Sequence, residues 1–312
     1  KKPTIPFVIK QDGRPCTSTD EAAQTWIQFF SDMEGGKRQS REELRHDWIQ
    51  SLRELSSEPF QMRADQLPTL VDLEMAFRRV ACGKATGPDM IPGEACHYAP
   101  EQFAKATFAT MWKLCLFGHE ALMHKGGLLV QAYKGKGDPK QCSSFRSLLI
   151  SSHVGKAVHR TLRMHQAGVF ESFLQAQQLG GRRAMPVTYG VHLTRAYMRQ
   201  AKDQGYSCAV ILLDLKEAFY RILRPLCMDG PLTDEMLARL MKTLKIPEDA
   251  LHELKRILEE PHALREAGLP VMEQRSVKAV HLQTHFWMRH QEDVVQTHHG
   301  TRPGDPFADI VF

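Results

Sequence analysis

The stretch CAVILLDLKEAFY, residues 208–220, decides the fold that the sequence predicts. Residues 208–213 are apolar without interruption, and a run of this length suits a β-strand that is covered on both faces. The run ends at Asp214, and the residues after it have the composition of a first helical turn. We therefore expect a buried strand that presents a carboxylate at its rim, as a metal site requires. An ordinary α/β strand whose last Asp caps the next helix predicts the same pattern.

Length and composition describe an ordinary globular chain that carries one basic segment. The chain has 312 residues, of which 42% are hydrophobic and 25% charged, with a net charge of +5. This length is enough for one large or two ordinary domains. Residues 121–170 hold eight Lys or Arg and one acid, Asp138. This local excess favours a polyphosphate partner, although a solvated basic face gives the same pattern.

The cysteines and the hydropathy indicate an intracellular protein. Seven cysteines occur without a C-x-x-C pair, which is typical of reduced thiols and not of a disulfide framework or a zinc site. No apolar run approaches the ~18 residues of a membrane span, and no signal-peptide pattern is present. We expect a nuclear or cytoplasmic location, no secretion and no membrane partner. Because the chain begins without Met and ends in an apolar stretch, we also expect it to be a fragment.

The order of predicted elements divides the chain into two parts. Residues 1–66 are expected to form an N-terminal helical linker region, with helices over 18–34 and 40–55. Residues 67–312 are expected to form the main domain, which opens on a helix that starts at Thr69.

A rigid loop and a basic hairpin follow that helix. The loop GKATGPDMIPGE, residues 83–94, is rich in turn residues but lacks the pattern of a P-loop. Residues 127–133 and 144–150 are predicted as two strands that flank a glycine- and lysine-rich tip. Such a hairpin suits a triphosphate, because phosphates are bound by flexible lysines and by the forked guanidinium of arginine. The candidates are Lys134, Lys136 and Arg146.

The last part of the chain is predicted to contain a strand pair and a tight turn. Residues 276–287 and 292–297 alternate in the manner of two strands. The segment GTRPGDPFADIVF, residues 300–312, then combines glycines and prolines with a helix start. This composition predicts a turn whose backbone approaches another group closely.

Four of these segments, together with QLGGRR at residues 178–183, resemble blocks of the reverse transcriptases of non-LTR (LINE-type) retrotransposons and occur in the order of those blocks. Residues 208–220 resemble motif A, and residues 300–312 resemble motif B. Three positions depart from the family pattern, since Ser147 stands for Pro, Gly181 for an aromatic residue and Pro303 for Gln. The five segments are the loop 83–94, the hairpin 127–150, QLGGRR at 178–183, 208–220 and 300–312.

The resemblance implies an α+β fold with reverse-transcriptase-like fingers and a partial palm, truncated before motif C and the thumb. It implies an RNA-directed DNA polymerase that transfers deoxynucleotides with two Mg²⁺ ions, and an RNA template, a DNA primer and deoxynucleoside triphosphates as partners. Asp214 would be the catalytic carboxylate, and it would hold metal together with the carbonyl of Leu215. Two further groups of residues are implied: Lys134, Lys136, Arg146, Phe219 and Gly304 for the nucleotide, and Lys84, Arg182, Arg183 and Arg302 for the template.

Two alternatives to an active polymerase remain open. The aromatic-x-Asp-Asp sequence of motif C does not occur in the chain, and a single Asp is a weak ligand set for two divalent ions. We therefore expect the isolated chain to be inactive, which fits a catalytically inactive nucleic-acid-binding remnant or scaffold. An unrelated doubly wound α/β enzyme is the other alternative, but it would need a glycine-rich phosphate loop after an early strand.

Overall fold

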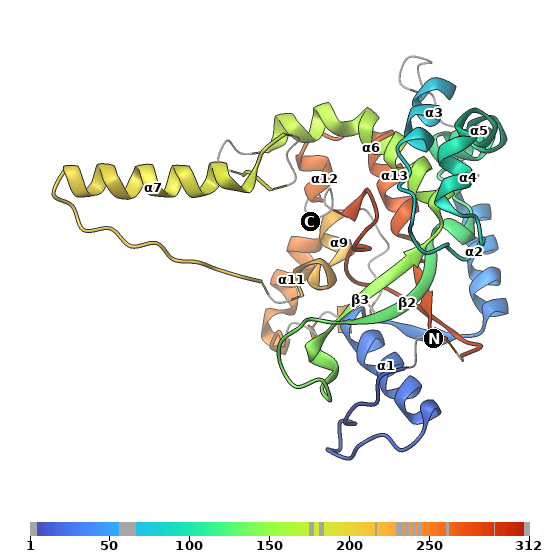
Figure 1. Cartoon of the computed structure of the whole chain (residues 1–312), viewed down its shortest axis with the longest axis horizontal. Coiled ribbons are helices and arrows are strands. Elements are labelled where there is room, and N and C mark those ends of the chain that lie inside the picture. Colours follow the sequence, from blue (N-terminus) through green and yellow to red (C-terminus); the bar gives the residue numbers. More distant parts are fainter. Residues whose placement is uncertain are drawn as a thin grey trace.

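The computed structural model has a mixed α+β architecture with 54% helix, 10% strand and one small mixed sheet (Figure 1). This confirms the α+β class; the finer likeness to polymerase fingers and palm stays a prediction. The structure describes residues 5–55, 67–174, 178–180, 184–215, 217–228, 234, 237–238, 241–242, 245–259, 262–289 and 291–308.

The sheet joins three distant parts of the chain in the order β1-β5-β4-β2-β3. The predicted hairpin is confirmed, because β2 (Gly126–Tyr133) and β3 (Phe145–Ser151) pair antiparallel in full register. The short strand β4 (His285–Trp287) runs parallel to β2 and antiparallel to β5 (Val294–Gln296). At the far edge, β1 (Lys37–Gln39) pairs with β5.

The N-terminal helices pack on this sheet and share its core. Ser18 caps α1 (Thr19–Met33) by accepting a hydrogen bond from the Glu21 amide, as the sequence predicts. Trp26 of α1 lies edge-on to Phe145 of β3, with ring centroids 5.0 Å apart. The second helix, α2 (Arg41–Leu55), follows β1 directly. Residues 5–39, expected as part of a linker region, therefore share the sheet and one core with strands β2 to β5.

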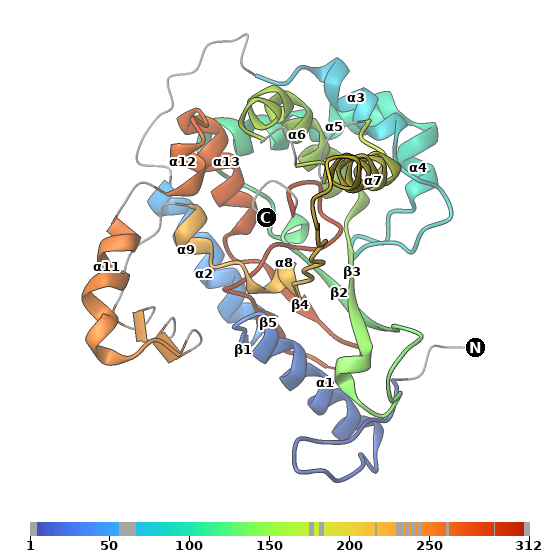
Figure 2. The ribbon, with the colours of Figure 1, turned by 90° about the vertical axis from the view of Figure 1, so that its left-hand side faces the viewer.

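A second core lies among the helices at the end of the body opposite α1 (Figure 2). Thr69 caps α3 (Leu70–Arg78) in a reciprocal capping box with Asp72. Leu73 and Phe77 of α3 are fully buried, and α3 packs against α5 and α6. The helices of this layer are α3, α4 (Gly93–Tyr98), α5 (Pro100–Phe117), α6 (His153–Phe173) and α13 (Val271–His281).

The strand expected over residues 276–287 is wrong for most of its length. Residues 271–281 form α13, and only 285–287 form a strand. The buried residues Val277 and Val280 are three apart, which is the spacing of one helix face and not of a strand.

The buried strand expected over residues 208–213 is also wrong. Helix α7 (Val187–Asp203) projects from the body, and residues 206–215 return along it as extended chain (Figure 1). Ile211 and Leu212 are 79% and 91% exposed. A strand requires a hydrogen-bonded neighbour, and no described strand pairs with this segment.

The remaining α-helices of the described chain are short, and in sequence they follow that segment and precede α13. They are α8 (Ala218–Arg221), α9 (Arg224–Cys227), α11 (Leu251–Glu259) and α12 (Ala263–Glu266). Within the described residues, no helix combines the length and the apolar character that crossing a bilayer requires.

Candidate nucleic-acid interface

The loop 83–94 is fixed to the start of α6 by side-chain hydrogen bonds. Ser152 donates to Asp89 Oδ2 over 2.5 Å, and its Oγ accepts from the Gly155 amide over 3.0 Å as the N-cap of α6. Gly87 lies so close that a Cβ atom there would be 2.6 Å from the Ser152 Cα. The loop therefore has one defined position beside α6, and it carries Lys84 with it.

A groove of about 350 Å³ lies between this loop, the end of β3, α6 and Gly304. Three cations line it, namely Lys84, Lys156 and Arg160, and none of the described lining residues is acidic. Burial lowers the pKa of Lys156, against the opposing effect of Asp305. Arg160 is held in place because its Nη1 donates to the Arg79 carbonyl over 2.9 Å. The groove is thus a concave cationic surface with a glycine backbone at one side.

The turn that carries Gly304 is docked against the residues that follow Asp214. The Gly300 amide donates to the Ile222 carbonyl over 2.8 Å, and the Thr301 amide donates to the Phe219 carbonyl over 2.7 Å. Gly300 has a φ of +73°, and a Cβ atom there would lie 2.7 Å from the Phe219 carbonyl oxygen. Only glycine suits this close approach. Segments 80 residues apart in sequence, both singled out as motifs, therefore meet in space.

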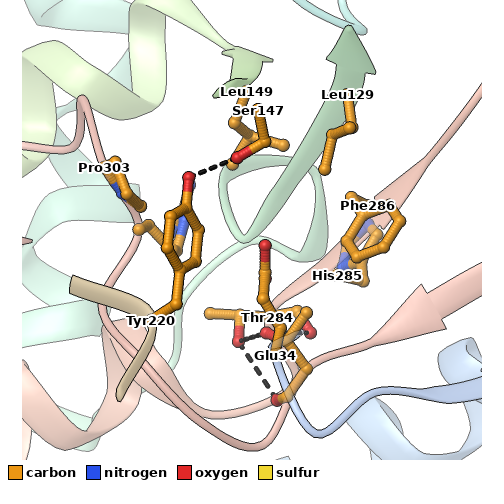
Figure 3. A pocket seen from close by; sticks show the side chains of 11 residues that line it. Glu34, Leu129, Ser147, Leu149, Tyr220, Thr284, His285, Phe286 and Pro303 are labelled. Carbon is orange, nitrogen blue, oxygen red and sulfur yellow. Dashed lines mark hydrogen bonds between the residues drawn. The ribbon is translucent and has the colours of Figure 1, made fainter. Parts of the chain in front are cut away.

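A small cavity lies between the hairpin and this turn (Figure 3). The Tyr220 hydroxyl is hydrogen-bonded to Ser147 of β3, and Pro303 lies beside the Tyr220 ring. The cavity of about 20 Å³ has room for about one water molecule. Glu34 borders it, and burial raises the pKa of Glu34 to about 7 although Arg224 and Arg302 oppose the shift. A nucleotide does not fit this cavity in the conformation described.

The hairpin residues expected to bind a triphosphate lie at the other end of the strands. Lys134 donates from Nζ to the Ser143 carbonyl over 2.6 Å, while Lys136 and Arg146 are exposed. The tip is fixed to the N-terminal arm, because the Ile9 amide donates to the Lys140 carbonyl over 2.8 Å. About six residues of strand, or roughly 20 Å, separate the tip from the groove. The structure does not bring the tip lysines together with Gly304.

The other expected site residues fall in different surroundings. Phe219 lies on α8 and is 36% exposed. Arg302, expected to face a template, is instead buried, since its Nη2 donates to the His124 carbonyl over 2.7 Å and lies 3.5 Å from Asp305. Arg182 and Arg183 lie outside the described residues.

The residues described do not form a magnesium site. Asp214 and Leu215 lie on the exposed extended segment, and no group of three His, Cys, Asp or Glu side chains in the described chain is placed to hold a metal ion. One carboxylate with one carbonyl is a poor fit to two divalent cations, which need several oxygen ligands each.

Sequence reasoning did not single out two residues of the groove. Lys156 and Arg160 were part of the basic segment 121–170, and their spacing of four places them on one face of a helix. That spacing was the available signal.

No protein-family model matches the chain, and no curated protein matches it either.

Proposed function

We propose that this chain binds the phosphate backbone of a nucleic acid in the groove between the loop 83–94 and α6. The observation that carries the proposal is the set of three cations, Lys84, Lys156 and Arg160, around a groove whose described lining has no acid. Clustered cations on a concave surface attract polyanions and release their counterions.

The motifs extend the proposal to a function. The groove is built from three segments that resemble reverse-transcriptase blocks, namely the loop 83–94, the end of the hairpin and the turn at Gly304. We infer that the chain supplies the fingers and part of the palm of an RNA-directed DNA polymerase. RNA template and DNA primer are then its partners, and deoxynucleoside triphosphates are the substrate of the complete site.

A catalytically inactive nucleic-acid-binding scaffold is the second candidate. It is favoured by the exposure of Asp214 and by the lack of a metal-ligand group among the described residues. Both candidates require the groove to bind nucleic acid, and they differ in whether Asp214 has a role.

Salt-dependent binding tests the groove. The affinity for a fluorescein-labelled 20-nucleotide single-stranded RNA is measured by anisotropy between 50 and 300 mM KCl. Lys156→Gln is expected to weaken binding and to reduce the slope of log K against log salt by about 0.7, as for one lost phosphate contact. Lys105→Gln is the matched control, because Lys105 is exposed on α5 and paired with Glu101. An unchanged slope in Lys156→Gln, or no binding by the wild-type chain, contradicts the proposal.

Primer extension tests the polymerase candidate in one direction. Template-directed extension with Mg²⁺ that is lost in Asp214→Ala, with RNA affinity unchanged, supports the polymerase and contradicts the scaffold. Lys156-dependent RNA binding without extension is expected both of the scaffold and of a partial palm that lacks motif C.

A further inference from the structure

A cluster of buried charges lies behind the groove, and Arg302 is its only member that was expected as a site residue from the sequence. Its centre is His159 of α6, which lies between Glu120 and Asp305. These three side chains are at most 3% exposed. Lys125 lies 3.4 Å from Glu120, and Arg302 lies 3.5 Å from Asp305. Three segments far apart in sequence therefore meet through charged groups in the core.

Both ring nitrogens of His159 face a carboxylate. Nδ1 lies 2.7 Å from Asp305 Oδ2, and Nε2 is hydrogen-bonded to Glu120 Oε1. A neutral imidazole has one N–H to donate, whereas the imidazolium donates from both nitrogens. The charged form therefore satisfies both carboxylates, which would otherwise be costly to bury.

Asp305 connects this cluster to the glycine turn. Its Oδ1 accepts from the Phe307 amide over 3.0 Å, and its own amide donates to the Arg302 carbonyl over 2.9 Å. Residues 302–307 are thus wrapped around the Asp305 carboxylate. Gly304, with a φ of +92°, lies inside this turn and lines the groove.

Helix α6 carries both the cluster and the groove. His159 points into the core from this helix, while Lys156 and Arg160 on the same helix line the groove. A bond between His159 and Asp305 therefore fixes the distance between the groove cations and Gly304.

We propose that His159 is a positioning residue that holds the turn 302–307 against α6 through Asp305, and so sets the shape of the groove for nucleic acid. This inference rests on the proposed function for its ligand. Its structural part, the fixing of the turn, does not depend on any ligand.

Because the charged imidazole makes both hydrogen bonds, the positioning of the turn by His159 depends on pH. Burial alone would lower the pKa of His159, but Asp305 and Glu120 outweigh burial and raise it to about 9. Because the folded pKa of His159 is raised, its charged form stabilises the folded protein fully below the ordinary histidine pKa of 6.5. This stabilisation is lost as the pH rises through about 9. The positioning is therefore expected to hold at neutral pH and to fail in alkali.

The other groups that face His159 keep their charge state at neutral pH. The pKa of Glu120 is lowered to about 2, because His159 and Lys125 outweigh burial, and that of Asp305 is lowered in the same way by His159 and Arg302. Burial lowers the pKa of His124 to about 4, so His124 stays neutral. Burial also lowers the pKa of Lys125 and of Lys156, so the lysines contribute their own alkaline change to binding.

The variant Glu120→Gln isolates the contribution of His159. A glutamine amide donates to Nε2, so a neutral imidazole then satisfies both neighbours and no longer needs its charge. RNA affinity is measured by anisotropy from pH 7 to 10 for both proteins. Above pH 9 the affinity of the wild type is expected to fall more steeply than that of Glu120→Gln, and the ratio of the two affinities should change by up to about tenfold per pH unit. Identical pH profiles for the two proteins overturn the proposal.

Hydrogen exchange tests the positioning without a ligand. At pH 7, His159→Gln is expected to raise the exchange of the backbone amides of residues 300–308 at least fivefold, while Glu120→Gln raises it less. His165→Gln, six residues further along α6, is the control and should leave these amides unchanged. Unaltered exchange in a folded His159→Gln protein overturns the proposal. If His159→Gln does not fold, the amides of residues 300–308 are compared above pH 9 in the wild type and in Glu120→Gln. Faster exchange in the wild type supports the proposal, and equal exchange overturns it.

The two failures are distinguishable. Absence of RNA binding at every pH contradicts the proposed function, while the exchange measurement still decides whether His159 fixes the turn.

Discussion

Arg224 shows how single buried residues hold the candidate site together. Its guanidinium donates to the carbonyls of His281, Thr297, His299 and Gly300 over 2.7–3.0 Å. Burial lowers its pKa to about 10, with Glu34 opposing the shift, so it remains charged at neutral pH. One side chain thus joins α9, the end of α13 and the residues that lead into the glycine turn.

Arg224→Ala is expected to lower the free energy of unfolding by about 3 kcal/mol or more, because several buried carbonyls lose their donor at once. Urea unfolding followed by circular dichroism measures the change. Arg221→Ala is the matched control, since Arg221 at the end of α8 is exposed and pairs with Glu217, the residue just before that helix. That control should cost less than about 0.5 kcal/mol. Equal costs for the two variants would show that the Arg224 hydrogen bonds contribute nothing particular.

At the scale of elements, the groove depends on how the loop 83–94 meets α6. Ser152 acts as helix cap and as donor to Asp89, and Gly87 permits the loop backbone to touch the start of the helix. The position of Lys84 is therefore set by packing between two elements and not by the helix alone.

Gly87→Ala is expected to destabilise the protein by about 1–3 kcal/mol, because the added Cβ meets backbone atoms that have little freedom to move. Gly168→Ala on α6 is the control. Nothing lies within 4 Å of a Cβ at that exposed helical position, and alanine should stabilise the helix by about 0.5–1 kcal/mol. Thermal unfolding of both variants gives the comparison, and a neutral Gly87→Ala would contradict the packing described.

At the scale of the whole molecule, the N-terminal segment and the hairpin form one body. The strand β1 extends the sheet at β5, and Trp26 and Phe30 of α1 are fully buried with Phe286 of β4 in one core. The groove therefore rests on a sheet that residues from both ends of the chain complete.

Trp26→Ala is expected to cost about 3–5 kcal/mol, as large-to-small changes of buried aromatic residues do. Trp112→Ala offers a control of the same chemistry, because Trp112 is 37% exposed and Trp26 is not exposed at all. Guanidinium unfolding should show a clearly smaller loss for Trp112→Ala. Similar losses would mean that Trp26 does not pack into the core that α1 shares with the sheet.

The sequence by itself determined the local elements of this protein. Caps and periodicity predicted α1, α2 and the start of α3 close to where they lie, because Ser18 and Thr69 act on backbone within one turn of themselves. The turn residues between β2 and β3 likewise predicted the hairpin. Only the tertiary structure decided which segments meet. The apolar run 208–213 suits a strand but pairs with none of those described, since pairing depends on a partner elsewhere in the chain. Tertiary packing alone also brought Lys84, Lys156 and Gly304 to one groove and placed His159 between two carboxylates, because such contacts join residues that no local pattern relates.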